Sequence, residues 1–209
     1  MNKNFIIDLD VKGLEELGNL KLPDPTLLDY YKRLSQREIF WNREVDEELV
    51  EFSHQIIQWN KDDKGIPIEN RIPIKIFINT VGGCLNSIMN FANVVKLSKT
   101  PVYTIGMGKI YSAGFLMLIA GTKRFCFKNS EGLLHSGSFG IINSTEKVMD
   151  YIEHTKKVEK SLKEYVVDNT KITQKEYEKR YRDEWFMLAT DMLKHGVVDC
   201  VIEDLEEVF

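Results

Sequence analysis

The stretch at residues 101–121 constrains the fold most, because a predicted buried strand meets a predicted buried helix there. Residues 101–105 are β-branched and aromatic and begin with a proline, a pattern typical of a buried strand. Glycines at 106 and 108 lead to Ser112, and the apolar run behind it predicts a short helix that ends near Gly121. The sequence therefore predicts that Ser112 lies at a tight junction between a strand and a helix.

Ser112 has two interpretations at such a junction. The first N–H groups of a helix have no partners and carry partial positive charge, so they can stabilise an oxyanion beside a nucleophilic hydroxyl. Serine is also a favoured N-cap residue, which would give Ser112 a purely structural role. The junction by itself leaves both interpretations open.

The composition is that of an ordinary globular chain. Its 209 residues, 43% hydrophobic and 29% charged, predict one domain with a full core. The net charge of −4 argues against a nucleic-acid partner, which needs a clustered basic face. No apolar run approaches the roughly 20 residues of a membrane span, so we expect no membrane partner. Acids within the N-terminal apolar region argue against a secretory signal.

The cysteines and the absence of cofactor motifs bear on the redox compartment and on metal or cofactor binding. Cys84, Cys126 and Cys200 are odd in number and scattered, without a C-x-x-C pair. We therefore expect small buried thiols in a reducing cytoplasm rather than a disulfide framework or a zinc site. No His, Cys and Asp set has ligand spacing and no Walker loop occurs, so we expect no metal and no cofactor in this chain.

Strand and helix patterns alternate along the chain. The expected strands are 38–41, 74–78, 101–105, 124–127, 133–135 and 197–202. The expected helices are 28–37, 45–59, 85–97, 112–121, 145–169, one opened by a capping box at 173–176, and 190–195. This alternation predicts an α/β fold with mostly parallel crossovers over residues 30–209. Residues 1–29 contain two prolines and are expected to form an N-terminal arm, a loop around a pore or a tail.

A nucleophilic serine needs a base, and histidine is the usual one. His54 and His154 are expected within charged or amphipathic helices, and His195 in the last helical turn before Gly196. His135 differs because it ends a short apolar strand, a position at which functional side chains are often displayed. A strand-end histidine bonded to backbone is the alternative interpretation.

The pair Gly82-Gly83 directly follows another predicted buried strand. Two glycines there let the backbone approach a substrate closely and present N–H donors. A plain turn is the alternative. A phosphate-binding loop is disfavoured, because no Lys-Ser/Thr pair follows and the G-x-G-x-x-G spacing is absent.

Five segments in order resemble the proteolytic subunit of Clp protease, over about residues 30–202. The matches are residues 31–40 with Y-x-R-L-x-x-R-x-I-F, 78–83 with I-N-S-P-G-G, 108–114 with G-x-A-A-S-M-G, 128–135 with P-N-S-x-x-M-I-H, and 196–199 with G-L-V-D. Each segment alone is weak, but five in register are improbable by coincidence. We expect residues 1–29 to form either an N-terminal arm or an axial segment. Their sequence does not match the axial loop of the family.

The resemblance implies a serine endopeptidase that cleaves unfolded polypeptides and short peptides through an acyl-enzyme. Ser112 would be the nucleophile, His135 the general base, and the N–H groups of Gly83 and Ala113 the oxyanion hole. The implied fold is crotonase-like, with stacked ββα units and a projecting handle helix at about 145–169. The implied assembly is two face-to-face seven-membered rings of identical subunits around a closed chamber. ATP would be used by a partner, a Clp-type AAA+ unfoldase.

The third member of the implied triad is ambiguous. An ungapped count back from Gly196 places the family's aspartate position on Glu184, and a slip of one residue places it on Asp183. A glutamate can orient an imidazole as an aspartate does. Alternatively, both are surface acids that pair with Arg180 or Arg182.

Several positions depart from the family pattern. Val81 replaces the usual proline, Ala113 the usual methionine, and Ser136-Gly137 the usual Gln-Pro. The alternatives are a crotonase-fold acyl-CoA hydratase or isomerase, a Ser–Lys peptidase that does not need His135, and a non-catalytic or regulatory ring subunit. The presence of both Ser112 and His135 favours the peptidase.

Overall fold

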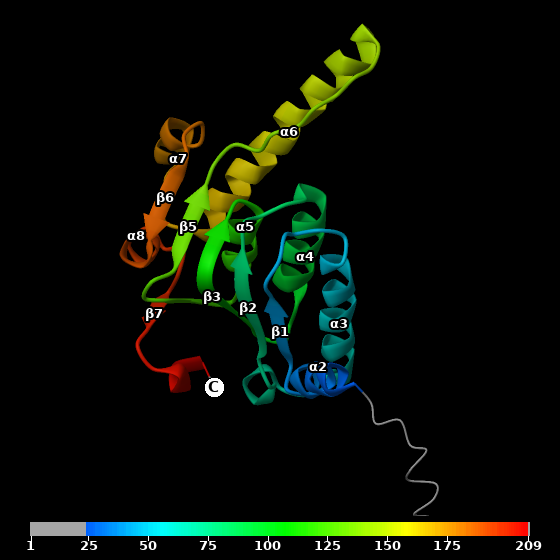
Figure 1. Ribbon diagram of the computed structural model, residues 1–209, viewed down its shortest axis with the longest axis vertical. Coiled ribbons are helices and arrows are strands. Elements are labelled where there is room, and N and C mark those ends of the chain that lie inside the picture. The colour runs from blue at the N-terminus through cyan, green and yellow to red at the C-terminus, as the bar shows by residue number, and fades with distance from the viewer. Residues whose placement is uncertain (1–23, 209) are drawn as a thin grey trace, which may run out of the picture. The chain divides into compact units, whose positions relative to one another are not determined.

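The computed structural model of the chain describes residues 24–208 (Figure 1). The arm expected over residues 1–29 therefore lies largely outside the described residues. The chain divides into two units, residues 1–36 and 37–209. The described part of the first unit is α2 (Pro25–Ser35) and its flanks, which begin at Asp24. The Asp24 carboxylate accepts the Thr26 N–H at 2.8 Å, so it caps this helix.

The second unit is built on one seven-stranded sheet. Five strands are parallel in the order β1 (Glu38–Trp41), β2 (Ile74–Thr80), β3 (Val102–Tyr111), β4 (Lys123–Phe127) and β7 (Cys200–Ile202). The far end of β3 pairs in parallel with β5 (Glu131–Leu134), and β5 pairs antiparallel with β6 (Trp185–Leu188). The predicted α/β fold with mostly parallel strands is thus confirmed.

Six α-helices accompany this sheet in the described residues. They are α3 (Leu49–Asp62), α4 (Leu85–Leu97), α5 (Ala113–Leu118), α6 (Thr145–Asn169), α7 (Gln174–Arg180) and α8 (Ala189–Lys194). The bounds predicted for α4 and α6 are confirmed. The Thr173 hydroxyl accepts the Glu176 N–H at 3.2 Å, which is one half of the predicted capping box of α7, while the Glu176 carboxylate lies 3.7 Å from His195 Nδ1. No helix among residues 24–208 is long and apolar enough to cross a membrane.

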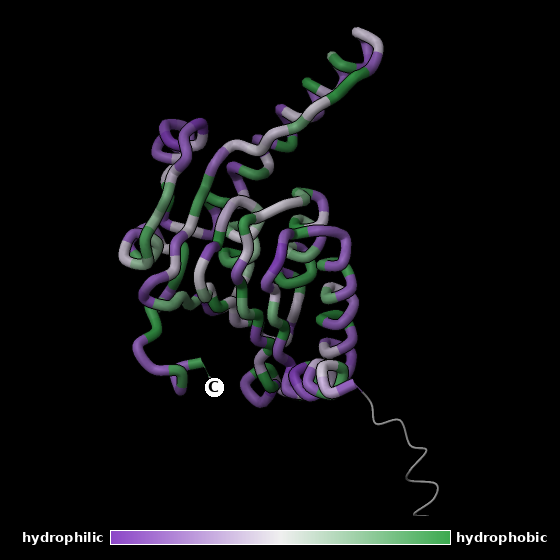
Figure 2. The backbone as a smooth tube through the Cα atoms, viewed as in Figure 1, coloured by the Kyte–Doolittle hydropathy of each residue, from purple (hydrophilic) through white to green (hydrophobic). Residues whose placement is uncertain are grey.

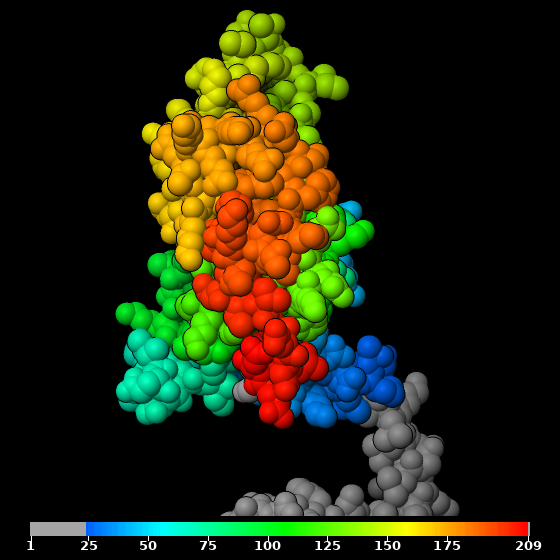
Figure 3. Space-filling model, turned by 90° about the vertical axis from the view of Figure 1, so that its left-hand side faces the viewer, coloured from blue at the N-terminus to red at the C-terminus, as the bar shows by residue number. Residues whose placement is uncertain are grey.

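Apolar residues fill both faces of the sheet. Ile74, Ile76 and Ile78 of β2 are fully buried, as are Ile88 and Phe91 of α4. The opposite face carries a second cluster, and the 3₁₀ helix at Leu205–Val208 packs on it. The space-filling view in Figure 3 shows the C-terminal residues in red, continuous with β6 and α8 in orange. Burial of the apolar surface on the two faces of the sheet is the main favourable contribution to folding, at about 25 cal/mol per Å² of apolar surface.

Helix α6 differs from the other long helices, because it projects away from the sheet (Figure 1). Hydrophobic and hydrophilic residues alternate along it in Figure 2. Its buried residues are Leu162 and Val166, both in the half nearer the sheet. The Tyr165 hydroxyl donates to the Leu116 carbonyl at 3.1 Å, which anchors α6 on α5.

The strand predicted to end at residue 105 continues to Tyr111, so the glycines at 106 and 108 do not form a turn. At these positions β3 leaves β4 and joins β5, and its register with β2 shifts between Ile78 and Thr80. A Cβ at Gly108 would lie 2.8 Å from Asn79 Oδ1, which itself accepts the Lys109 N–H at 3.0 Å. The glycine serves this close approach rather than a reversal of the chain.

Three further expectations are corrected. Strand β6 was not predicted, because all four of its residues are apolar although only Trp185 and Met187 are buried. Helix α3 begins at Leu49 rather than 45, because Val45 forms a β-bridge with Gly83. Cys84, expected to be buried, is exposed.

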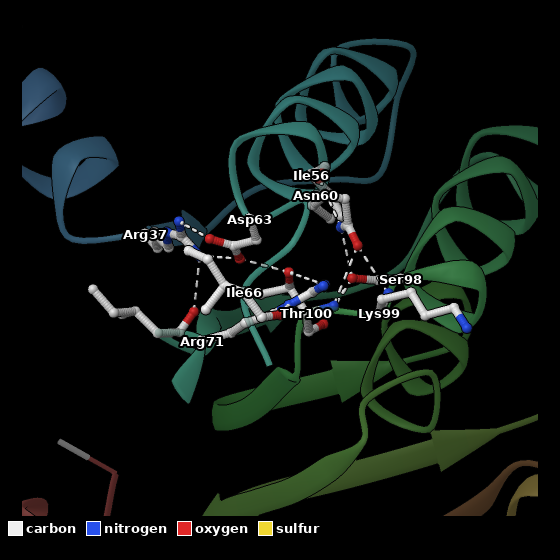
Figure 4. A network of polar contacts seen from close by, with 10 residues as sticks. Arg37, Ile56, Asn60, Asp63, Ile66, Arg71, Ser98, Lys99 and Thr100 are labelled. Atoms are coloured by element: carbon white, nitrogen blue, oxygen red, sulfur yellow. Dashed lines mark hydrogen bonds and ion pairs between the residues drawn. The ribbon is translucent and has the colours of Figure 1, made fainter. Parts of the chain in front are cut away.

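A buried polar network joins the start of β1 to the end of α3 and the segment after α4 (Figure 4). The Arg37 guanidinium donates two hydrogen bonds of 2.7 Å to the Asp63 carboxylate, and the Thr100 hydroxyl donates a third at 2.7 Å. Asp63 is only 2% exposed. The hydrogen bonds from Arg37 hold the pKa of the Asp63 carboxyl below its ordinary value despite burial. This network fixes the corner of the domain opposite the site described next.

Candidate active site

Ser112 lies where β3 ends and α5 begins, in a backbone conformation that is rare for a residue with a side chain. Its φ is 53° and its ψ is −113°. Such a conformation costs about 1–3 kcal/mol and persists only when the surroundings impose it. Here the Ser112 N–H donates to the Leu133 carbonyl at 2.9 Å, and the Ser112 carbonyl accepts the Phe115 N–H at 3.0 Å.

The Ser112 hydroxyl does not cap α5. Within residues 24–208 it makes no hydrogen bond at all, so its proton and lone pairs are unused. The purely structural interpretation of Ser112 therefore loses its physical basis, because a capping serine must accept an N–H from the first helical turn.

Gly82 and Gly83 lie beside Ser112 and both have positive φ, 107° and 143°. A Cβ on Gly82 would lie 2.8 Å from the Ser112 Cβ, and one on Gly83 only 2.2 Å from the Val45 carbonyl oxygen. Val45 holds the segment by donating to the Gly82 carbonyl and accepting from the Cys84 N–H, each at 2.7 Å. The glycine pair is therefore held by a parallel β-bridge to Val45 and is not a plain turn.

Two backbone donors face the cavity near Ser112. Neither the Gly83 N–H nor the Ala113 N–H donates to any described residue. Gly83 N–H is free because Val45 pairs with the groups on either side of it, and Ala113 N–H is free because it is the first of α5. An anion at this position could accept hydrogen bonds from both.

His135 and Glu184 are brought together by the pairing of β5 with β6, which lie side by side in Figure 1. The last pair in the register is Leu134 opposite Trp185, so the next residue of each strand, His135 and Glu184, also face one another. The His135 Nδ1 atom lies 3.0 Å from Glu184 Oε1. The His135 side chain is 29% exposed and that of Glu184 is 60% exposed.

The same register leaves Asp183 out of reach of this contact. Its N–H donates to the Arg180 carbonyl at 2.9 Å, and the chain turns there before β6 begins. Within residues 24–208 neither Asp183 nor Glu184 forms an ion pair with Arg180 or Arg182. Arg180 instead lies over the Trp185 ring, 5.2 Å from its centroid. Of the two carboxylates that the sequence left open, Glu184 is the one beside the histidine.

One cavity of about 830 Å³ contains Gly83, Ser112, Ala113 and His135 in its wall. The rest of the wall comes from the start of α4, the segment 137–141 and one side of α6. Ser112 and His135 share this cavity but are not hydrogen-bonded to one another. A second cavity, of about 500 Å³ at the ends of α3 and α4, contains none of these four residues.

Two residues near the site had no signal in the sequence. Cys84 lines the cavity at the start of α4, where hydrogen bonding to Ser87 lowers the pKa of its thiol. The Tyr111 hydroxyl donates to a Glu131 carboxylate oxygen at 2.6 Å, which raises the pKa of Tyr111 to about 12. The Tyr111 ring also contacts Phe186, with centroids 5.8 Å apart, and so ties β3 to β5 and β6.

Possible metal ligands do not gather in the described part of the chain. No group of three or more His, Cys, Asp or Glu side chains among residues 24–208 is placed to hold an ion.

Comparison with known proteins identifies the family of this chain. The sequence model of the Clp protease family matches residues 24–205. The chain belongs to the Clp protease family. It is similar to three proteins named ATP-dependent Clp protease proteolytic subunit 2. That of Treponema pallidum is 26% identical over 83% of this chain and 86% of its own. That of Treponema denticola is 24% identical over 98% of both, and that of Corynebacterium diphtheriae is 28% identical over 85% of this chain and 87% of its own.

These identities make the chain a divergent member of the Clp protease family. The α/β fold with a parallel sheet agrees with that membership. The family match also covers every residue of the candidate site, from Gly83 to Glu184.

Proposed function

We propose that this Clp protease family member is a serine endopeptidase subunit with Ser112 as nucleophile, His135 as general base and Glu184 as the orienting carboxylate. The observation that carries the proposal is the His135–Glu184 contact of 3.0 Å on the cavity that holds Ser112. The strained backbone and unused hydroxyl of Ser112 support it, because they are features of a displayed nucleophile.

The reaction would begin with attack of Ser112 Oγ on the scissile carbonyl carbon while His135 Nε2 takes the hydroxyl proton. The carbonyl oxygen becomes an oxyanion and accepts hydrogen bonds from the N–H groups of Gly83 and Ala113. The C–N bond then breaks, and His135 gives its proton to the leaving amine. Water, deprotonated by the same imidazole, cleaves the acyl-enzyme ester and regenerates Ser112.

Glu184 would act on the imidazole and not on the substrate. Its carboxylate would accept the Nδ1–H of His135, which would leave Nε2 as the basic nitrogen available to Ser112. The negative charge also favours the imidazolium that forms during the attack. Ser112 and His135 would come into hydrogen-bond contact when substrate binds, since such contacts are often long in the free enzyme.

We further propose that the substrates are unfolded polypeptides and short peptides, cleaved inside a chamber of two stacked, seven-membered rings. Exposed apolar residues on and beside α6 support an assembly, because Ile142 is fully exposed and Met149 and Tyr151 are more than half exposed in the single chain. ATP would be used by a Clp-type unfoldase partner, and this chain would carry no cofactor. A reducing, cytoplasmic location suits its three free cysteines.

The test is labelling of the assembled particle with a fluorophosphonate probe, together with peptidase assays. We expect the probe to modify Ser112, and Ser112→Ala to abolish both labelling and peptide cleavage. Ser138→Ala is the matched control, because Ser138 lines the same cavity and should leave both signals unchanged. Cleavage that survives Ser112→Ala would overturn the proposal. Absence of labelling in the assembled wild type would favour a non-catalytic ring subunit.

A further inference from the structure

The side of α6 that faces the cavity has an unusual charge pattern. Tyr151, His154, Thr155, Val158, Glu159 and Leu162 line the cavity at spacings of three and four residues, which places them on one side of the helix. The five lysines of α6, at positions 147, 156, 157, 160 and 163, do not line it. Among the described residues in the cavity wall, Glu159 is the single carboxylate and no lysine or arginine is present.

The Glu159 carboxylate has no cationic partner among residues 24–208. Its neighbours on the same helix differ, since Glu153 pairs with Lys156 at 2.9 Å and Glu164 with Lys160 at 3.9 Å. An acid with an ion pair has its charge partly offset, whereas the charge of Glu159 is available to a bound cation.

Glu159 shares the cavity wall with Tyr181, the residue that follows α7. Burial is the main cause that raises the pKa of both Tyr177 and Tyr181, and the negative charge of Glu159 raises each of them further. Tyr181 lines the cavity, and the two rings stack with their centroids 4.6 Å apart. Glu159 and Tyr181 are both part of the cavity wall.

Part of the wall of the cavity that contains Ser112 and Glu159 is apolar. Leu116, Leu134 and Leu162 line the cavity and are between 2% and 9% exposed. A side chain with an aliphatic stem and a cationic end would match both parts of this wall, since its methylenes would contact the leucines while its charge reached the carboxylate.

We propose that Glu159 makes this site prefer a lysine or arginine side chain on the acyl side of the scissile bond. The inference rests on the proposed peptidase function and names its substrate class. Glu159 is a specificity-determining residue in this proposal, because it would bind the substrate side chain and take no part in bond cleavage. Substrates with an acidic side chain at the same position would be repelled by the same charge.

The experiment compares peptides that are identical except for lysine, norleucine or glutamate before the scissile bond. Norleucine is the matched control, because it keeps the aliphatic stem and lacks the charge. In the assembled wild type we expect kcat/KM to be about fivefold higher for lysine than for norleucine, the size of a partly solvated ion pair. Glu159→Gln should remove this preference and leave the norleucine value within about twofold. Glu164→Gln, on the same helix but outside the cavity wall, should change neither value.

A second measurement separates this inference from the catalytic proposal. The Ser112→Ala particle is titrated with fluorescent lysine and norleucine peptides, and binding is followed by anisotropy at low and high salt. A lysine preference of several-fold that weakens at high salt and disappears with Glu159→Gln supports the inference even if no peptide is cleaved. Equal affinities for the two peptides, or a preference that Glu159→Gln leaves intact, would overturn it.

Discussion

Arg37 and Ser112 are the two non-glycine residues with positive φ among residues 24–208, at 59° and 53°. They lie in opposite environments. The Arg37 side chain is 14% exposed and is held by Asp63, which is itself buried and hydrogen-bonded on all sides (Figure 4). The Ser112 hydroxyl makes no hydrogen bond and opens on a cavity. A positive φ thus accompanies a hydrogen-bonded structural network in one region and an unpaired hydroxyl on a cavity wall in the other.

The carboxylates of the two regions, Asp63 beside Arg37 and Glu184 beside His135, differ in the same way. Asp63 and Glu184 each lie about 3 Å from a basic side chain, yet Asp63 is buried and Glu184 is more than half exposed. Removing a buried partner leaves an unpaired charge in the interior, whereas an exposed pair contributes little to stability. We therefore expect Asp63 to control stability and Glu184 to control activity.

The largest effect is expected for Glu184→Gln. An amide cannot stabilise the imidazolium and can hold the wrong tautomer of His135, so kcat should fall by about 10³- to 10⁴-fold. The melting temperature should change by no more than about 2 °C, because the pair is exposed. Peptidase assays and thermal melts of the same preparation provide the two readings. Asp183→Asn is the matched control, and a loss of activity as large as that of Glu184→Gln would contradict the assignment.

The choice between Glu184 and Asp183 is the part of the candidate site that the sequence could not decide. The strand ends at which Ser112, Gly83 and His135 lie could be recognised from local sequence, while their candidate roles came from the resemblance to the Clp protease family. Glu184 could not be separated from Asp183, because the choice depends on strand β6 and its pairing with β5 far away along the chain. Four consecutive apolar residues carry no visible alternation, although Phe186 and Leu188 are 51% and 62% exposed.

The glycines of β3 show a second limit. Gly106 and Gly108 have the composition of a turn, and the sequence predicted that the strand ends before them. In the fold these residues lie inside a ten-residue strand, because hydrogen bonds to three neighbouring strands outweigh the weak local preference of glycine. Local patterns placed Ser112 at the junction of a strand and a helix, where the structure has it, but they misjudged where that strand ends.

The second prediction concerns the buried acid. Asp63→Ala should lower the free energy of unfolding by about 3–5 kcal/mol, because it leaves the Arg37 guanidinium without its partner in a largely buried position. Urea denaturation measures this loss. Asp62→Ala is the control, since Asp62 forms its hydrogen bond with Gln58 at an exposed position and should cost less than about 1 kcal/mol. Similar losses for the two variants would show that burial does not distinguish them.

The third prediction is the pH dependence of the Asp63 contribution. The pKa of Asp63 is lower in the folded chain than in the unfolded chain, where it is about 3.9. Its contribution is therefore present above pH 4 and is lost as the pH falls through the folded value. The stability difference between wild type and Asp63→Asn should be constant from pH 7 to about 5 and shrink below 4. A difference that is unchanged at pH 3 would contradict the shift.

The smallest expected change in stability is that of Ser112→Gly, which separates backbone strain from function at this residue. Ser112→Gly should relieve a strain of about 1–3 kcal/mol, less about 0.5–1 kcal/mol for the greater freedom of glycine in the unfolded chain. A net gain of about 1 kcal/mol in urea denaturation is expected, together with complete loss of peptidase activity. Ser112→Ala removes the same hydroxyl but keeps the Cβ and the strain, so it should lose activity without gaining stability. Equal stability of the two variants would mean that the backbone at Ser112 is not strained, and the parallel with Arg37 would fail.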